Sequence, residues 1–166
     1  MLTINPKDEE FMRLAIEQAN IAVSLSGAAE VGCVIVRDGA IVASGFNEAE
    51  RQFDPTGHAE IITLRKLGKQ EKQIQFPGCT LYVTLQPCTM CTSACVWAGI
   101  DRIVYGASRG DVHSMYFDAK HIDPIDIVHD AYKSAIQIVG GVLANECSNL
   151  YYRPLDNPPP EEQLNS

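Results

Sequence analysis

A β-hairpin signal in the first third of the chain constrains the fold more than any other feature. An apolar run over residues 31–36 and a second over 40–43 are separated by a short stretch that contains the pair Asp38-Gly39. Asp-Gly between two apolar runs favours a tight turn in which both central residues have positive φ, and such a turn joins neighbouring antiparallel strands. We therefore expect the sheet to contain an antiparallel pair.

Strands alternate with helices after this hairpin. Runs rich in β-branched and apolar residues predict strands over 79–85, 102–105 and 135–139. Helices are expected from about residue 58 to Gly68, from Pro87 to about Ala98, over 125–133 and over 142–152. With a first helix that starts after Asn5, this order predicts an α/β fold of three layers, α-β-α, with a mixed sheet between the helices.

The composition fits one globular domain in a reducing compartment. The chain has 166 residues, 46% of them hydrophobic, and we expect a single domain over 1–152 and a flexible tail over 153–166. No run approaches the length of a membrane span, and residues 1–10 are polar and acidic, so we expect a soluble, cytoplasmic protein without membrane contact. The six cysteines are then expected to be free thiols or metal ligands.

Two cysteines and one histidine have the spacing of a metal site. Cys88 and Cys91 lie three residues apart at a predicted helix start, about 4.5 Å apart in rise, near the roughly 3.8 Å separation of two sulfurs on tetrahedral zinc. Cys95 would lie about 10 Å along the axis from Cys88, and Cys79 more than about 20 Å away, so neither fits the same tetrahedron. With His58 the ligands number three, which is typical of catalytic Zn²⁺ with a position left for water.

Glu60 follows His58 by two residues in the first turn of its predicted helix. On a regular helix the two side chains diverge by about 200°, so Glu60 is expected to reach the water rather than the metal. The partial positive charge of a helix N-terminus favours the thiolates of Cys88 and Cys91. The pattern H-x-E with P-C-x-x-C is the signature of zinc nucleobase deaminases.

Three segments resemble the cytidine deaminase-like superfamily, most of all bacterial guanine deaminase-like and tRNA adenosine deaminase-like enzymes of nucleoside metabolism: DPTGHAEI at 54–61, TLQPCTMC at 84–91 and GVLANEC at 141–147. The resemblance implies a five-stranded sheet, a homodimer or higher oligomer, and a zinc-dependent hydrolase. It further implies that activated water attacks the ring carbon bearing an amino group while Glu60 protonates the adjacent nitrogen and then the departing ammonia. Relatives usually have Glu where this chain has Gln86, and Ala where it has Gly57.

The resemblance and the neighbourhood of the metal residues suggest six substrate contacts: Asn47, Ala59, Pro87, Tyr116, Phe117 and Asp118. Asn47 would hydrogen-bond the base, as in the family. Tyr116 and Phe117, in the polar stretch 106–124, could stack on the base, and Asp118 could accept hydrogen bonds from its amino group or ring N–H. Core packing for the two rings and a solvated carboxylate are the more ordinary interpretations.

Other site types remain open at this stage. A structural zinc site would need a fourth ligand, a thioredoxin-like dithiol would use Cys88 and Cys91 without His58, and a binding module could keep the fold without the activity.

The carrier of the base is also open. The net charge of −8 and the scarcity of basic residues after Arg153 favour a free nucleobase or nucleoside over the alternative, the wobble adenosine of a tRNA. A basic cluster could meet a phosphate backbone, although cations near a helix C-terminus are also expected from the helix dipole: Arg65, Lys66, Lys69 and Lys72. The stretch 139–147 is more similar to the tRNA-acting relatives.

Overall fold

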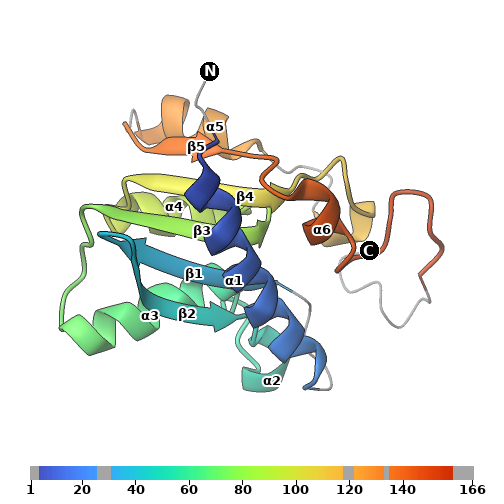
Figure 1. The fold of residues 1–166 in the computed structure, drawn as a ribbon, viewed down its shortest axis with the longest axis horizontal. Coiled ribbons are helices and arrows are strands. Elements are labelled where there is room, and N and C mark those ends of the chain that lie inside the picture. Colours follow the sequence, from blue (N-terminus) through green and yellow to red (C-terminus); the bar gives the residue numbers. More distant parts are fainter. Residues whose placement is uncertain (1–3, 26–30, 118–121, 133–134, 159–166) are drawn as a thin grey trace.

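The Asp38-Gly39 turn joins β1 (Gly32–Arg37) to β2 (Ala40–Phe46), and both turn residues have positive φ, 52° and 76°. β1 also pairs antiparallel with β3 (Cys79–Leu85), while β3, β4 (Arg102–Ala107) and β5 (Gln137–Val139) run parallel. The strand order β2-β1-β3-β4-β5 confirms the mixed five-stranded sheet. The computed structural model describes residues 4–25, 31–117, 122–132 and 135–158 (Figure 1).

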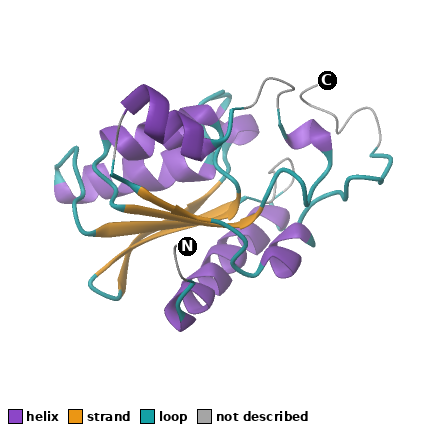
Figure 2. Cartoon of the chain, turned by 90° about the horizontal axis from the view of Figure 1, so that it is seen from above, coloured by secondary structure: helices purple, strands orange, loops and turns teal. Residues whose placement is uncertain are grey.

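Helices cover both faces of the sheet, which confirms the three-layer prediction (Figure 2). One face carries α1 (Pro6–Val23) and the short α6 (Ala144–Ser148); the other carries α3 (Ala59–Glu71), α4 (Thr89–Trp97) and a π-helical turn, Ile127–Tyr132. The connections contain α2 (Ala49–Gln52), a 3₁₀ turn (Ser114–Tyr116) and α5 (Pro124–Asp126). Every helix within the described ranges is too short or too polar to span a bilayer.

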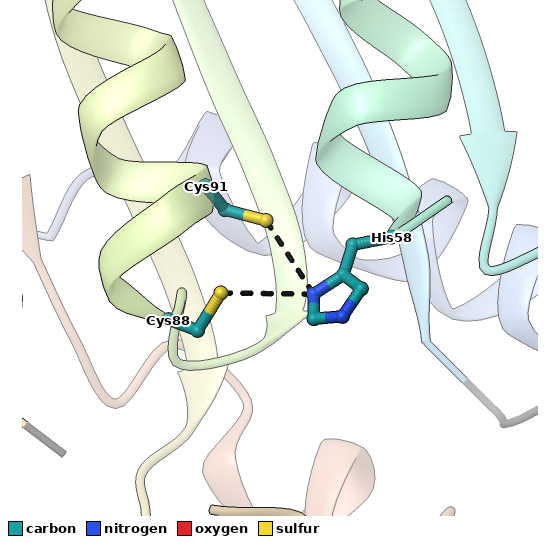
Figure 3. A group of neighbouring side chains, drawn as sticks. All are labelled: His58, Cys88 and Cys91. Atoms are coloured by element: carbon teal, nitrogen blue, oxygen red, sulfur yellow. Dashed lines mark hydrogen bonds between the residues drawn. The ribbon is translucent and has the colours of Figure 1, made fainter. Parts of the chain in front are cut away.

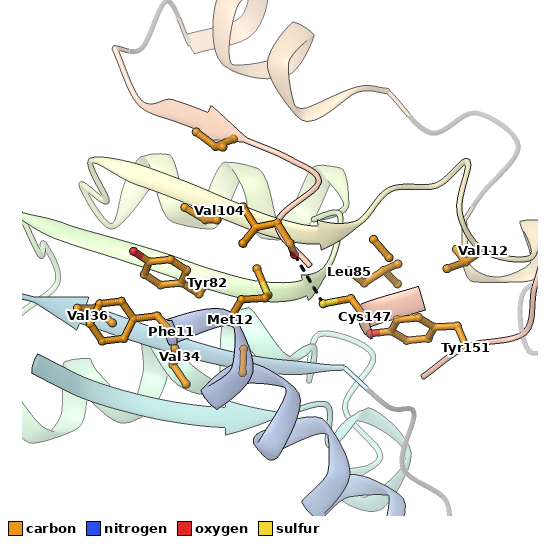
Figure 4. Packing of buried hydrophobic residues seen from close by; sticks show 14 of the residues in the cluster. Phe11, Met12, Val34, Val36, Tyr82, Leu85, Val104, Val112, Cys147 and Tyr151 are labelled. Carbon is orange, nitrogen blue, oxygen red and sulfur yellow. Dashed lines mark hydrogen bonds between the residues drawn. The ribbon is translucent and has the colours of Figure 1, made fainter. Parts of the chain in front are cut away.

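β1 explains why its sequence is apolar without alternation. Val34 and Val36 pack under α1 with Phe11 and Met12 (Figure 4), whereas Ile35 packs under α3 on the opposite face. A strand buried on both faces needs apolar side chains on both. β1 and β3 each lie between two other strands of the sheet. The residues that follow β3 therefore begin at a strand whose position is fixed on both sides.

Asp8 ties the start of α1 to the sheet. Asn5 caps α1 as predicted, and its own N–H donates to the Asp8 carboxylate at 2.9 Å. That carboxylate is completely buried and also accepts from the Tyr82 hydroxyl at 3.0 Å and from both guanidinium nitrogens of Arg102, at 2.6 and 2.8 Å. Burial alone would raise the pKa of Asp8, but the hydrogen bonds from Arg102, Asn5 and Tyr82 outweigh it and lower the pKa.

The predicted helices differ from the structure mainly toward the C-terminus. The helix expected over 125–133 is a short α-helix continued by the π-helical turn, and the strand expected over 135–139 covers only its last three residues. The final helix, expected over 142–152, is limited to Ala144–Ser148. Leu143 takes a left-handed conformation, φ 53°, which stops the helix from starting earlier, and the Tyr151 hydroxyl instead hydrogen-bonds Thr84 at 2.7 Å.

Candidate metal centre and active site

His58 and Cys88 occupy equivalent places on two neighbouring helices. Each is an N-cap residue in extended conformation, His58 before α3 and Cys88 before α4, and neither side chain makes the capping hydrogen bond usual at that position. β3 ends at Leu85, so Gln86 and Pro87 lead directly to Cys88. The two helix starts thus face each other at the end of the sheet, with both side chains free to point between them (Figure 3).

The three predicted ligands converge. The sulfurs of Cys88 and Cys91 each lie 3.6 Å from Nδ1 of His58, and the three donor atoms lie within 4.8 Å of one another. Bonds of 2.3 Å to sulfur and about 2.05 Å to nitrogen at a tetrahedral angle place these atoms about 3.6 Å apart. The separations therefore match two edges of a zinc tetrahedron. Cys91 is fully buried and the other two are half-buried, so the cluster has a closed side and an open side.

The electrostatics of the cluster favour a thiolate at Cys88. A hydrogen bond from the Cys91 thiol lowers the pKa of Cys88 to about 4 against the opposing effect of burial, and His58 lowers it further. The same hydrogen bond and burial raise the pKa of Cys91. One thiol is thus already disposed to ionise, and a divalent cation would favour loss of the second proton.

Glu60 lies in the first turn of α3 and is only 4% exposed. Burial raises the pKa of its carboxyl to about 7, and the charge on Cys88 adds to the rise, whereas His58 and a hydrogen bond from Cys91 act in the opposite direction. The carboxyl does not belong to the donor cluster. Such a group beside a metal site can take up and release a proton near neutral pH.

Three of the predicted substrate contacts either follow β2 directly or are next to a metal donor in the sequence. Asn47 directly follows β2; its N–H donates to the Val31 carbonyl at 3.0 Å and its side-chain oxygen accepts from the Ala49 N–H at 3.4 Å. Ala59 and Pro87 are buried next to His58 and Cys88 respectively. Their role as substrate contacts stays a prediction.

The remaining predicted contacts have other partners or lie outside the described residues. The Tyr116 hydroxyl accepts from the Tyr152 N–H at 3.2 Å, and its ring packs edge-on against Tyr151 at 5.3 Å. Phe117 is 9% exposed and belongs to the core cluster that also contains residues of α1. Asp118 lies outside the described residues. The two aromatic rings thus connect the 106–117 stretch to the core and to the C-terminal segment.

Two features near the site were not anticipated from the sequence. Gln86 is 4% exposed, and its side chain hydrogen-bonds both Arg109 and Asp123, two residues of the segment that follows β4. Gly57 lies under α2, where an added Cβ would come within 2.9 Å of the Cα of Ala49. Both positions depart from the usual residues of the resembling family, and that departure was the only signal in the sequence.

The other cysteines stay apart from the cluster. Cys95 and Cys79 are fully buried members of the core under α3 and α4. None of the six cysteines, all of which lie in the described ranges, forms a disulfide. Neither Cys95 nor Cys79 belongs to the donor cluster, as predicted from helix and strand geometry, and within the described residues only His58, Cys88 and Cys91 form a candidate metal cluster.

Comparison with known proteins agrees with this geometry. The family described as "Cytidine and deoxycytidylate deaminase zinc-binding region" matches residues 5–107. The chain is 40% identical over 142 residues to a tRNA-specific adenosine deaminase of Haemophilus influenzae, which covers 85% of this chain and 79% of that protein. It is 37% identical over 114 residues to a guanine deaminase of Bacillus subtilis, covering 69% and 73%.

A solved structure from a study of A-to-I editing by tRNA:A34 deaminases at the wobble position shares the fold, with a TM-score of 0.72 and 30% identity over 85% of this chain and 98% of that chain. The family match spans both helix starts that carry the donor cluster. On these grounds, the chain belongs to the cytidine and deoxycytidylate deaminase family and is a zinc-dependent deaminase.

Proposed function

We propose that this chain deaminates adenosine to inosine in tRNA, with His58, Cys88 and Cys91 as the zinc ligands and Glu60 as the proton carrier. The observation that carries the chemistry is the convergence of three donors at tetrahedral separations beside a buried carboxyl whose pKa is about 7. An ion held by three protein ligands keeps a position for water, which is typical of catalytic rather than structural zinc.

Zinc bound at such a site activates a water molecule for attack near neutral pH. The chain's own contribution is the movement of protons: the Glu60 carboxylate takes one proton of the attacking water and delivers it to the ring nitrogen next to the reacting carbon. It then takes the proton of the hydroxyl group now on that carbon and passes it to the amino group, which leaves as ammonia as the carbonyl forms. Burial of Glu60 suits this role because a pKa near the working pH allows both uptake and release.

The relatives support tRNA as the carrier of the base. The tRNA-specific adenosine deaminase from Haemophilus influenzae is 40% identical and covers most of both chains. The net charge of −8 favoured a free base, but it describes the whole chain rather than the surface beside the site. The basic cluster contributes little to this choice, since Arg65 pairs with Asp54 at 2.7 Å and Lys66 donates to the Ser44 carbonyl at 3.2 Å.

The second candidate is deamination of free guanine. It is supported by 37% identity to the Bacillus subtilis guanine deaminase, over a shorter stretch of the chain. The two candidates share the metal residues and Glu60, so they differ only in the groups that receive the base.

A substrate comparison with the zinc-loaded protein separates the two. The substrates are an anticodon stem-loop with adenosine at the wobble position, the same stem-loop with guanosine there, and free guanine, adenine and their nucleosides. We expect inosine in digests of the first stem-loop, measured by mass spectrometry, together with stoichiometric ammonia. Turnover of guanine to xanthine without inosine in the RNA would replace the tRNA proposal by the second candidate.

Glu60→Gln tests the proton carrier on whichever substrate is turned over. The variant keeps the size of the side chain and removes its acid–base function, so we expect turnover to fall about 10²- to 10⁴-fold with zinc content near one per chain. Glu10→Gln, which changes an exposed carboxyl of α1, is the matched control and should leave turnover unchanged. Cys88→Ala should instead lose the metal. Wild-type turnover by Glu60→Gln would refute the assigned role.

A further inference from the structure

Gln86 connects the turn that carries Cys88 to two points beyond β4. Its backbone N–H donates to the Ala107 carbonyl at 2.8 Å. Its side-chain oxygen accepts from the Arg109 N–H at 2.9 Å, and its amide nitrogen donates to the Asp123 carboxylate at 3.3 Å. The side chain is almost fully buried and uses both ends of its amide.

Each partner of this amide holds a further part of the same region. The guanidinium of Arg109 lies 5.9 Å from the centre of the Phe117 ring. The other carboxylate oxygen of Asp123 accepts from the Ile125 N–H at 2.8 Å and so caps α5. One amide therefore fixes residues before and after the stretch in which substrate contacts were predicted.

The position requires an amide rather than a carboxylate. Arg109 presents a donor and Asp123 an acceptor, and only a group with one oxygen and one N–H₂ satisfies both. A glutamate at 86 would place two carboxylates about 3.3 Å apart in a region that is already acidic. The Asp111 carboxylate lies just after β4, where it accepts from the Ser108 N–H at 2.7 Å. Burial raises the pKa of Tyr105, and the charges of Asp123 and Asp111 raise it further.

We propose that Gln86 is a positioning residue: it holds the Arg109 and Asp123 regions against the Pro87-Cys88 turn, so that the substrate side of the site keeps its place relative to the metal donors. This inference rests on the proposed function, and it concerns how the substrate is received rather than the chemical step. Gln86 is not one of the metal donors, and it is assigned no part in the transfer of protons. Substitution of Gln86 should accordingly change KM more than kcat.

The test exchanges the amide and the carboxylate of the hydrogen-bonded pair Gln86 and Asp123. Gln86→Glu leaves an acceptor for Arg109 but sets a carboxylate against Asp123. Adding Asp123→Asn restores a donor and an acceptor with their direction reversed, and Asn still caps α5 because its side-chain oxygen can accept from Ile125. Gln73→Glu, an exposed position before β3, adds the same charge and is the control.

We expect KM to rise about tenfold in Gln86→Glu with kcat changed less than about twofold, the loss of roughly one hydrogen bond to a charged group. The double variant should return KM to within about threefold of wild type, because a reversed bond replaces the lost one. Gln73→Glu should match wild type. A double variant no better than Gln86→Glu, or a Gln86→Glu protein with wild-type KM, would overturn the proposal.

Amide hydrogen exchange separates this inference from the proposed function. The Ile125 N–H should exchange about tenfold faster in Gln86→Glu than in wild type and recover in the double variant, whatever substrate the protein accepts. Recovery together with no inosine formation by wild type would reject the tRNA proposal and retain the positioning role. Unchanged exchange at Ile125 would reject the positioning role even if inosine is formed.

Discussion

Replacing Asp8 by Asn should destabilise the fold without touching the metal site. Asp8 is fully buried, and Arg102 is only 16% exposed at its side chain. The substitution keeps the size of the side chain but removes the charge, and its amide nitrogen cannot accept from Arg102. Arg102 is then left as a poorly paired buried cation, and the Tyr82 hydroxyl competes for the remaining oxygen.

The expected cost follows from that burial. Removing one partner of a buried ion pair costs about 3–5 kcal/mol, because the other charge stays desolvated. For a domain of this size each kcal/mol lowers Tm by about 2–4 °C, so the shift should be about 10 °C. Zinc content should remain at the wild-type value, since Asp8 contacts the β4 residue Arg102 at the amino end of that strand, away from the Leu85 end of β3 that leads to Cys88.

The assay is urea unfolding of zinc-loaded protein followed by circular dichroism. The control is Glu9→Gln, at a neighbouring carboxylate whose side chain is 50% exposed. It should change the free energy of unfolding by less than about 0.5 kcal/mol. Asp8→Leu combined with Arg102→Met should recover much of the loss, because an apolar pair removes the stranded charge. A loss below about 1 kcal/mol in Asp8→Asn would refute this account of the buried pair.

Three further outcomes follow from the structure. Removal of zinc should lower Tm, and added zinc at about 1,000 times its Kd should restore about 4 kcal/mol in wild type but not in Cys88→Ala, as measured by calorimetry. Gly57→Ala should cost about 1–3 kcal/mol, because the new Cβ would approach Ala49 to 2.9 Å; an unchanged Tm would contradict the crowding seen under α2. Stability should fall as pH drops below about 4, because hydrogen bonds from Thr56 and Arg65 lower the pKa of Asp54 to about 2 and the pKa of Asp8 is also lowered. A carboxyl whose pKa is lower in the folded state stabilises the fold above its unfolded pKa, and this stabilisation is lost as the carboxylate is protonated. In urea titrations, Asp8→Asn should therefore lose less free energy of unfolding on acidification than wild type.

The sequence predicted those parts of the fold that depend on local chemistry. The Asp38-Gly39 turn forms because both residues tolerate positive φ, and β3 covers residues 79–85 as expected because its β-branched run ends at Gln86-Pro87. The metal cluster was also predictable, since helix rise and bond lengths decide which cysteines can share an ion.

Features that depend on distant partners could not be read in the same way. No local pattern marks Asp8 as a structural residue, because its partner Arg102 is 94 residues away. The Tyr116 hydroxyl accepts from the Tyr152 N–H, 36 residues further along the chain, and no local pattern shows this contact. The last helix was overextended because periodicity does not show that Tyr151 turns back to Thr84. In each case a tertiary contact overrides a local preference.

The use of two N-cap positions for metal donors has a consequence for how such proteins can change. His58 and Cys88 are held by α3 and α4, whose apolar sides are packed under the sheet through residues such as Leu67 and Cys95. The predicted substrate contacts Asn47 and Tyr116 instead belong to the connecting segments after β2 and after β4. If these connections receive the base, changes confined to them would alter which base is accepted, while His58 and Cys88 keep their places at the ends of helices that belong to the core.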